Sequence, residues 1–332
     1  MCFIKKIFNG YVVNNKYDGT IMIQNILHKI KGKFDAFKYI APKNSHELEN
    51  YHEDAKDYWT QHNITLHHQF ASQEESLEYF HWRNDQYYKY IQLMPVAGYD
   101  GKAILDYGCG PGHDLVGFGA FSSPSRLVGA DLSASSLGEA KDRLALHGIA
   151  AELAPISPDK HTLPFDDASI DHIHCSGVLH HTPDPLRILR EFKRILRPRG
   201  TANIMVYHYH SLWVHLYVAY VRSIEQGLFP ELPLLEQFAR STDGEDCPIS
   251  TCYTVDQWIA ICSQAGLEAT FTGAAVSVHE ASLLQKRFSA IQDRRMPPES
   301  RRFLAELEFD AGGLPLYKGI HAGIDACFAI RN

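Results

Sequence analysis

A glycine-rich turn is the part of this sequence whose residue types and spacing best suit chemistry. It lies where a predicted β-strand gives way to a helix and reads Asp106-Tyr107-Gly108-Cys109-Gly110-Pro111-Gly112-His113-Asp114. Glycines at alternate positions let the backbone turn tightly and approach a ligand with no side chain in the way. In open α/β sheets, ligands bind beyond the carboxyl ends of the strands. The turn therefore predicts a ligand site at that edge of a sheet.

The turn does not fit two common phosphate-binding patterns. His113 stands at the third place of Gly-x-Gly-x-x-Gly, counted from Gly108 and Gly110, so the dinucleotide signature is not met. No Lys-Ser/Thr pair follows to complete a phosphate loop. These departures point away from dinucleotide and nucleoside triphosphate ligands.

Asp131 supplies a second element, at the end of the next predicted strand. A carboxylate in this place can accept hydrogen bonds from both hydroxyls of a ribose. Taken alone, Asp131 could equally cap the helix that follows it. Together with the glycine turn, ligand binding is the favoured interpretation.

Further motifs follow in a fixed order along the chain. They are Asp159-Lys160-His161-Thr162-Leu163-Pro164-Phe165-Asp166-Asp167, Cys175-Ser176-Gly177-Val178-Leu179-His180-His181-Thr182-Pro183-Asp184-Pro185 and Leu196-Arg197-Pro198-Arg199-Gly200. With the glycine turn and Asp131, they make residues 102–207 resemble the class I S-adenosylmethionine-dependent methyltransferases, in the branch of the ubiquinone and menaquinone enzymes. The resemblance covers about a third of the chain, with the motifs in the family's order and spacing.

The resemblance implies a cofactor, S-adenosyl-L-methionine, with S-adenosyl-L-homocysteine as its product, and a set of binding residues. Asp131 would hold the ribose hydroxyls, Asp159 the adenine amino group, and Ser176 would lie near the methyl donor. Pro158 and Lys160 stand where the family usually has a glycine and a small residue, which weakens the assignment of Asp159. The full implied cofactor set is Asp106, Gly108, Cys109, Gly110, Gly112, Asp131, Leu132, Asp159 and Ser176, and Arg83 could reach the cofactor's carboxylate.

Residues outside these motifs are expected to recognise the methyl acceptor. His208 and His210 directly follow the fifth predicted strand, and histidine has the right pKa range for a general base. Structural contacts are the alternative for both, and His180 and His181 are interpreted as positioning their loop. The candidate substrate contacts are Tyr207, His181, Arg240 and Asp243.

These residues favour O-methylation of a small molecule or of a sugar unit in a glycan. The Asn/Asp-Pro-Pro-Tyr/Phe signature used for amino groups of bases and amides is absent after the fourth strand, where Ser176-Gly177-Val178-Leu179 stands instead. One alternative is N- or C-methylation of a quinone-like or amine metabolite. Another is a cofactor-binding regulatory protein without turnover.

Composition narrows the partners and the compartment. The net charge is −7, and residues 1–43 alone carry +6, so the rest is acidic and unlike a general nucleic-acid binder. The seven cysteines are scattered and form no Cys-x-x-Cys pair, which predicts reduced thiols and no metal site. No secretory signal or membrane-spanning run is recognised. We expect a cytoplasmic enzyme with no nucleic-acid partner; its oligomeric state is left open.

The elements that must position these residues alternate along the chain. Predicted strands at 103–107, 127–130, 170–175 and 201–207 are separated by predicted helices at 114–120, 135–147 and 185–196, which indicates βαβ units and a parallel sheet. The expected fold is α/β and Rossmann-like, a mostly parallel seven-stranded sheet whose last strand is antiparallel. Its expected parts are a basic extension (1–43), an aromatic-rich helical cap (44–98) and a methyltransferase domain (99–332) with a helical insertion at about 208–252, after the fifth strand.

Overall fold

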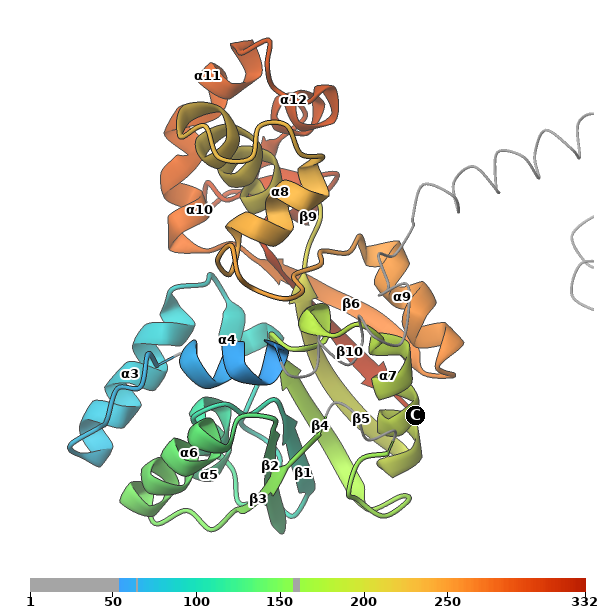
Figure 1. Cartoon of the computed structure of the whole chain (residues 1–332). Helices are drawn as coiled ribbons and strands as arrows, with labels where there is room; N and C mark the ends of the chain where they lie inside the picture. Colours follow the sequence, from blue (N-terminus) through green and yellow to red (C-terminus); the bar gives the residue numbers. More distant parts are fainter. Residues whose placement is uncertain (1–53, 64, 158–161) are drawn as a thin grey trace, which may run out of the picture. The chain divides into compact units, whose positions relative to one another are not determined.

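A computed structural model describes residues 54–63, 65–157 and 162–332 of the chain, all within one compact unit. A seven-stranded sheet forms its centre, in the order β3-β2-β1-β4-β5-β10-β6 (Figure 1). Strands β3, β2, β1, β4 and β5 are parallel, and β10 runs antiparallel to both β5 and β6. The predicted fold class is confirmed. The strands are β1 (Ala103–Tyr107), β2 (Arg126–Asp131), β3 (Glu152–Pro155), β4 (Ile170–Ser176), β5 (Leu196–Tyr207), β6 (Glu268–Ala275) and β10 (Asp325–Arg331).

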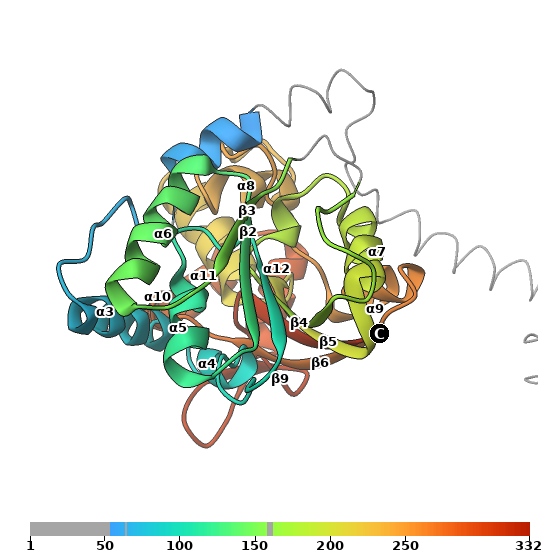
Figure 2. The same ribbon diagram turned by 90° about the horizontal axis from the view of Figure 1, so that it is seen from below.

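Helices cover both faces of this sheet (Figure 2). Strand β1 is buried along its whole length, and its alternating side chains enter two separate cores. Ile104 packs with residues of α5 (His113–Phe121) and α6 (Ala134–His147), whereas Leu105 packs with residues of α7 (Pro185–Ile195) and α9 (Val255–Gln264). Burial on both faces explains why β1 is apolar at every position except Asp106.

The helices begin and end where the sequence supplies the right residues. The Ser133 hydroxyl accepts from the backbone of Ser136 at the start of α6, and the Asp184 carboxylate accepts from Arg187 at the start of α7. Gly266 follows α9 in the left-handed conformation (φ +78°), as a C′ glycine does. These caps fix the direction in which each helix leaves the sheet.

The described part of the cap segment is helical in pieces. It holds a helix over residues 54–61, α3 (Gln73–Asp85) and α4 (Tyr90–Leu93), with irregular chain between the first two. Helix α3 buries Phe80 in the same core as α5 and α6. The cap is therefore packed on the sheet domain through its own apolar residues. The predicted extension, residues 1–43, lies outside the described residues.

A helical lobe stands at the carboxyl edge of the sheet (Figure 1). The lobe is built from two insertions, the predicted one after β5 and a second between β6 and β10. Both contribute to one apolar core, which includes Leu216 from the first and Phe303 from the second. The lobe consists of η3 (Trp213–Glu225, a π-helix), α8 (Leu234–Ser241), α10 (Val278–Ser282), η4 (Leu283–Lys286), α11 (Arg287–Gln292), α12 (Pro298–Ala305) and a small sheet of β7 (Glu308–Phe309), β8 (Pro315–Tyr317) and β9 (Ile320–His321).

Glu280 joins the two insertions. Its fully buried carboxylate accepts hydrogen bonds from the backbone of Trp213 (3.0 Å), at the start of η3, and of Ile324 (3.4 Å), just before β10. It also accepts from the backbone and the hydroxyl of Ser277, both at 2.8 Å. One side chain thus satisfies polar groups from three segments at the junction of lobe and sheet. Among the described residues, no helix combines the length and apolar character needed to cross a bilayer.

Candidate active site

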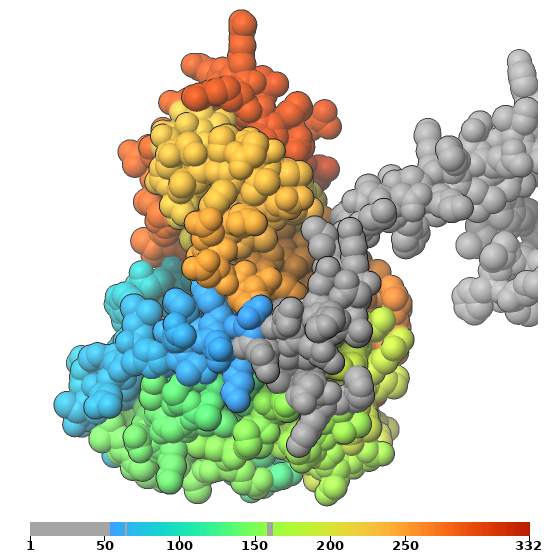
Figure 3. Space-filling model, viewed as in Figure 1, coloured from blue at the N-terminus to red at the C-terminus, as the bar shows by residue number. Residues whose placement is uncertain are grey.

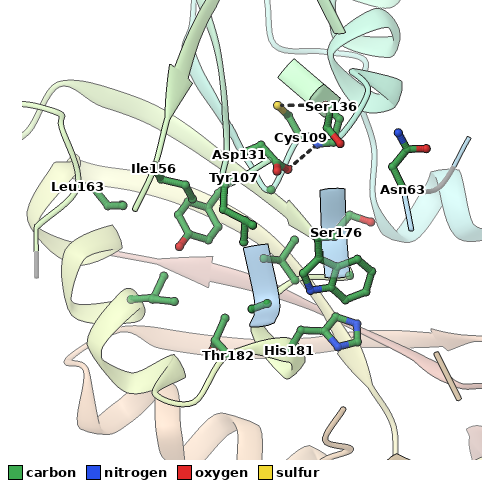
Figure 4. A pocket seen from close by; sticks show the side chains of 18 of the residues that line it. Asn63, Tyr107, Cys109, Asp131, Ser136, Ile156, Leu163, Ser176, His181 and Thr182 are labelled. Atoms are coloured by element: carbon green, nitrogen blue, oxygen red, sulfur yellow. Dashed lines mark hydrogen bonds between the residues drawn. The ribbon is translucent and has the colours of Figure 1, made fainter. Parts of the chain in front are cut away.

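A pocket opens at the carboxyl ends of β1, β2 and β4 (Figure 4). Its inner walls come from the glycine turn after β1, the residues after β2 and the segment after β4. Ala55, Trp59, His62 and Asn63 line it from the cap side, and Figure 3 shows cap residues, in blue, between the green sheet domain and the gold and orange lobe. Parallel strands bring residues from distant motifs to this one edge.

The three alternate glycines of the turn, Gly108, Gly110 and Gly112, all have left-handed backbone conformations with positive φ. Gly108 (φ +77°) packs so tightly that a Cβ there would overlap the Val178 side chain. Gly110 (φ +50°) differs, because a Cβ there would meet nothing within 4 Å. Gly108 is therefore required by the packing of the protein itself, whereas Gly110 keeps open the space that a bound ligand would use.

Asp131 holds this turn from the end of β2. One carboxylate oxygen accepts from the backbone N–H of Gly110 (2.8 Å) and the other from that of Ser133 (2.8 Å). The side chain is buried, and this burial raises the pKa of Asp131. Each carboxylate oxygen keeps a further lone pair, so the group can also accept hydroxyl donors from a ligand.

Charged groups collect beneath and beside the turn. Burial raises the pKa of Asp106 to about 8, and its Oδ2 has no hydrogen-bond partner among the described residues. Asp114 lines the pocket and lies 3.4 Å from Nε2 of the fully buried His174. Burial by itself would raise the pKa of Asp114, but His174 keeps it below the ordinary value. The site thus presents acids to any cationic group of a ligand.

Arg83 adds a cation from α3 to the same pocket. No hydrogen bond or ion pair joins its guanidinium to another described residue. Burial lowers the pKa of Arg83, but Tyr90 and Asp114 outweigh that effect, so the group stays charged. A cation and two acids in one pocket suit a ligand that carries both an ammonium and a carboxylate group.

A second polar group, the mouth cluster, is formed by Tyr58, His181, Tyr207, Asp243 and Ser250. The Tyr207 hydroxyl donates to Oδ1 of Asp243 and the Ser250 hydroxyl to Oδ2, both at 2.8 Å. The Tyr58 hydroxyl donates to the backbone carbonyl of Asp243. His181 lines the pocket, with Nε2 3.9 Å from Asp243 Oδ2. The cluster joins the cap helix, β5, η2 (Leu179–His181) and the loop after α8.

Comparison with known proteins agrees with this architecture. Residues 105–204, which contain the glycine turn, Asp131 and the segment after β4, match the family described as "Methyltransferase domain". Residues 105–204 thus form a domain of the class I S-adenosylmethionine-dependent methyltransferases. The cofactor of this domain family is S-adenosylmethionine, as the sequence motifs predict.

Individual relatives of this methyltransferase match over different lengths. An uncharacterized 37.1 kDa protein in transposon TN4556 of Streptomyces fradiae is 40% identical over 34% of this chain and 32% of its own length. The probable methyltransferase ltbC of Aspergillus luteorubrus is 29% identical over 57% of this chain and 80% of its own. A tRNA U34 carboxymethyltransferase of Campylobacter curvus is 33% identical over 34% of this chain and 37% of its own. Two of these three relatives are thus matched over only about a third of their length.

Among solved structures, the S-adenosylmethionine dependent methyltransferase from Mesorhizobium loti is similar at 17% identity, with a TM-score of 0.44. The match covers 74% of this chain and 97% of that one. It is a likeness of fold.

The structure brings most predicted cofactor residues of the methyltransferase together. Asp106 and Gly112 lie behind the turn, where Gly112 packs on α6, and Asp159 falls outside the described residues. Ser176 is also hydrogen-bonded by the Tyr90 hydroxyl from α4. Those in the pocket wall are Arg83, Gly108, Cys109, Gly110, Asp131, Leu132 and Ser176.

The two predicted bases do not lie in the pocket wall. His208 is buried on the opposite side of the chain from Tyr207, its Nδ1 is 3.3 Å from the Gly323 carbonyl, and burial lowers its pKa to about 3. His210 packs among aromatic rings, Tyr209 and Tyr317 included, and burial lowers its pKa too. Both histidines therefore have structural surroundings, and we do not retain them as bases.

Three of the four predicted substrate residues lie at the pocket or in the mouth cluster, and the fourth does not. His181 lines the pocket, and Tyr207 and Asp243 support it within the mouth cluster. Arg240 is half exposed on α8 and lies 3.9 Å from the exposed Glu245, away from the pocket wall. Sequence reasoning missed the cap-side wall, of which Trp59 is the largest member, since an aromatic stripe is more often only packing.

His181, Asp243 and Cys247 each offer one possible metal ligand, with these atoms within 4.8 Å of one another. Their hydrogen bonds already account for the grouping. His181 Nδ1 lies 2.7 Å and Cys247 Sγ 3.4 Å from the carbonyl oxygen of Ile249, while Asp243 accepts from Ser250. We therefore treat them as a hydrogen-bonded cluster.

Proposed function

We propose that this methyltransferase transfers a methyl group from S-adenosylmethionine to a hydroxyl group of a small molecule or of a sugar unit in a glycan. One observation carries the proposal. The pocket has one wall, formed by the glycine turn and Asp131, that would suit a nucleoside, and it also has a polar wall that contains His181 of the mouth cluster. Cofactor and acceptor sites thus share one cavity.

The residues present fit S-adenosylmethionine. The open space at Gly110 admits the cofactor, Asp131 would accept from the ribose hydroxyls, and Leu132 would pack on the adenine. The carboxylate of Asp114 in the pocket wall suits the ammonium of its methionine part, and Arg83 suits its carboxylate. Asp106, with its unpaired oxygen, would support the turn from behind. When bound, the cofactor supplies an electrophilic methyl group on a sulfonium.

The chain's own contribution is to align the acceptor and to exclude water. Ser176 ends β4 in the pocket wall, between the turn and His181. Trp59 packs against His181 with ring centroids 4.6 Å apart and so closes the wall from the cap side. Such a partly apolar enclosure strengthens the polar contacts within it.

A hydroxyl acceptor is favoured over other classes by the chemistry of the polar wall. A hydroxyl must lose its proton during transfer, whereas an amine need only be neutral. The segment after β4, Ser176-Gly177-Val178, also lacks the signature for planar amino groups. N- or C-methylation of an amine or quinone-like metabolite is the second candidate, and cofactor binding without turnover is the third.

A nucleic-acid acceptor is disfavoured by the net charge of −7. One relative is nevertheless named as a tRNA U34 carboxymethyltransferase. The absence of a nucleic-acid partner therefore stays a prediction, and transfer RNA belongs in the acceptor pool of the test.

Two measurements test the proposal separately. Calorimetry with S-adenosylmethionine and S-adenosylhomocysteine is expected to give binding at one site per chain, and no binding to either would refute the cofactor assignment. Methyl-tritiated cofactor, incubated with sugar, phenol, quinone, amine and transfer-RNA pools, is expected to label a hydroxyl compound. If label enters only amine nitrogens or carbon atoms, N- or C-methylation replaces O-methylation as the proposed function. If the protein binds the cofactor but labels no compound, cofactor binding without turnover is favoured.

A further inference from the structure

One end of the pocket is apolar and lies next to Asp131. Its wall is formed by Leu132, Ile156, Leu163 and Ile188. Ile156 follows β3, and its backbone N–H donates to the carbonyl oxygen of Asp131 (3.0 Å), so this end adjoins the carboxylate that suits the ribose. Figure 4 shows Leu163 and Ile156 together there, with Asn63 on the opposite side of the pocket. The flat, mostly apolar faces of a purine base fit such a wall.

Leu163 belongs to an irregular segment, residues 162–167, which leads into β4. Because no sheet ladder fixes this segment, its backbone polar groups need other partners. The guanidinium of Arg194, on α7, supplies them. Its Nη2 donates to the carbonyl oxygen of Leu163 (3.1 Å), and its Nη1 donates to that of Phe165 (2.9 Å) and to Oδ1 of Asp167 (2.6 Å). One side chain thus holds the segment at three points.

Glu191, one turn earlier on α7, completes the attachment. Its Oε2 accepts from the backbone N–H of Leu163 (2.8 Å) and from Nη2 of Arg194 (2.7 Å), and its Oε1 accepts from Nε of Arg194 (3.0 Å). These bonds lower the pKa of Glu191 and raise that of Arg194, so both groups are charged. With exposed fractions of only 27% for Arg194 and 14% for Glu191, this ion pair is less screened by water than an ordinary surface pair.

We propose that Arg194 is a positioning residue for the base of the cofactor and acts through Leu163. The inference rests on the proposed placement of S-adenosylmethionine. Arg194 itself is not in the pocket wall; it fixes how far Leu163 stands from Ile156, and with that the space for the base. Without Arg194, the carbonyl groups of Leu163 and Phe165 would turn to water and the segment would leave its place. Contacts to the ribose and the methionine part come from β1, β2, α3 and α5 and would remain.

Two ligands separate this role from a general support of the fold. S-adenosylhomocysteine carries the base, whereas S-ribosylhomocysteine has the ribose and homocysteine without it. Affinities of the full-length protein are measured by calorimetry, and by NMR titration for the weaker ligand. In Arg194→Gln, we expect affinity for S-adenosylhomocysteine to fall by about tenfold or more and affinity for S-ribosylhomocysteine to stay within about twofold of the wild type.

A matched control is Arg197, at the start of β5, whose guanidinium donates to Oδ2 of Asp171 (2.7 Å) away from the pocket wall. Arg197→Gln should bind both ligands as the wild type does. A second variant, Arg194→Lys, keeps the charge, but one ammonium group cannot reach Leu163, Phe165 and both carboxylates together. Its loss of affinity should be confined to S-adenosylhomocysteine as well. Where circular dichroism shows that Arg194→Gln does not fold, Arg194→Lys decides.

Three results would overturn the inference. An equal loss of affinity for both ligands in a folded variant would show that Arg194 supports the domain as a whole. Wild-type affinity of Arg194→Gln for S-adenosylhomocysteine would show that Leu163 keeps its place without the guanidinium. Equal binding of both ligands by the wild type would show that the base makes no contact at this end. If the wild type binds neither ligand, the proposed function itself fails.

Discussion

Asp131 is the single residue on which the cofactor interpretation depends most. In Asp131→Asn, one oxygen is replaced by an NH₂ group that cannot accept, so either the Gly110 or the Ser133 backbone N–H loses its partner. A hydrogen bond to a charged group contributes about 1.5–3 kcal/mol, so we expect affinity for S-adenosylhomocysteine to fall by about 10- to 100-fold in calorimetry. Asp142→Asn, exposed on α6, is the control and should bind normally. Equal affinity of all three proteins would contradict the assignment.

Alanine substitutions at two glycines of the turn should have different effects, one on cofactor affinity and the other on thermal stability. A methyl group at Gly110 meets open space, so Gly110→Ala should fold but place a side chain where the ligand belongs, and cofactor affinity should drop by at least about tenfold. A methyl group at Gly108 overlaps Val178, so Gly108→Ala should lower the thermal midpoint of the ligand-free protein by several degrees. Thermal unfolding and calorimetry on both variants separate the two effects. The reverse pattern would mean that Gly110 does not face the ligand.

For single residues, the sequence predicts the glycine turn and Asp131 of the cofactor side well, and the residues on the acceptor side of the pocket poorly. The turn and Asp131 form a local pattern, with each role tied to the end of a strand. The sequence does not show that His208 is buried away from the pocket wall, because neighbouring residues at a strand end point in opposite directions and only Tyr207 faces the mouth cluster. The partnership of His181 with Asp243 spans more than sixty residues, and no local pattern reports it.

The sequence predicts the strands and helices of the sheet domain, but it does not predict how the helices of the lobe pair with one another. The run 103–107 is strand β1 as predicted, because a short apolar run bounded by turn residues has few alternatives. Near the end of the chain, β9 and β10 are separated around Gly323, whose backbone lies too close to Ala275 for a side chain. The lobe needs both insertions to bury its core, and helical periodicity does not tell which distant helix is the partner.

Glu280 gives a prediction about how these elements are joined. In Glu280→Ala, the backbone N–H groups of Ser277 and Trp213 lose a buried acceptor, and that of Ile324 loses a weaker one. Each unsatisfied buried donor costs about 1–3 kcal/mol, so the free energy of unfolding should fall by about 3 kcal/mol or more in urea titrations. Glu299→Ala, exposed on α12 in the same lobe, should change it by less than about 0.5 kcal/mol. A small effect of Glu280→Ala would mean that the insertions are held by their apolar core alone.

For the molecule as a whole, the acids buried between sheet, cap and lobe predict how stability depends on pH. Burial raises the pKa of Asp325, at the start of β10, to about 8, against 3.8 for the free side chain. The folded protein then keeps a proton that the unfolded chain has released, so this group's contribution is complete below about pH 4 and is lost as pH rises to about 8. Asp325 alone should then lower the free energy of unfolding over this range, by up to about 1.4 kcal/mol per pH unit.

Asp325→Asn isolates that contribution, because the amide resembles the protonated carboxyl group in shape and does not titrate. Its free energy of unfolding, measured in urea at pH 5, 6, 7 and 8, should decline less steeply than that of the wild type, and the two should diverge most at pH 8. Glu280, with a pKa raised to about 7 by burial, has the same sign and remains in both proteins. The buried His208 acts in the opposite direction, since burial lowers its pKa from 6.5 to about 3 and its contribution is lost as the pH falls from about 6.5 toward 3; it too remains in both proteins. Parallel curves for the two proteins would show that Asp325 is ionised when folded, with the charge of Arg83 offsetting the effect of burial.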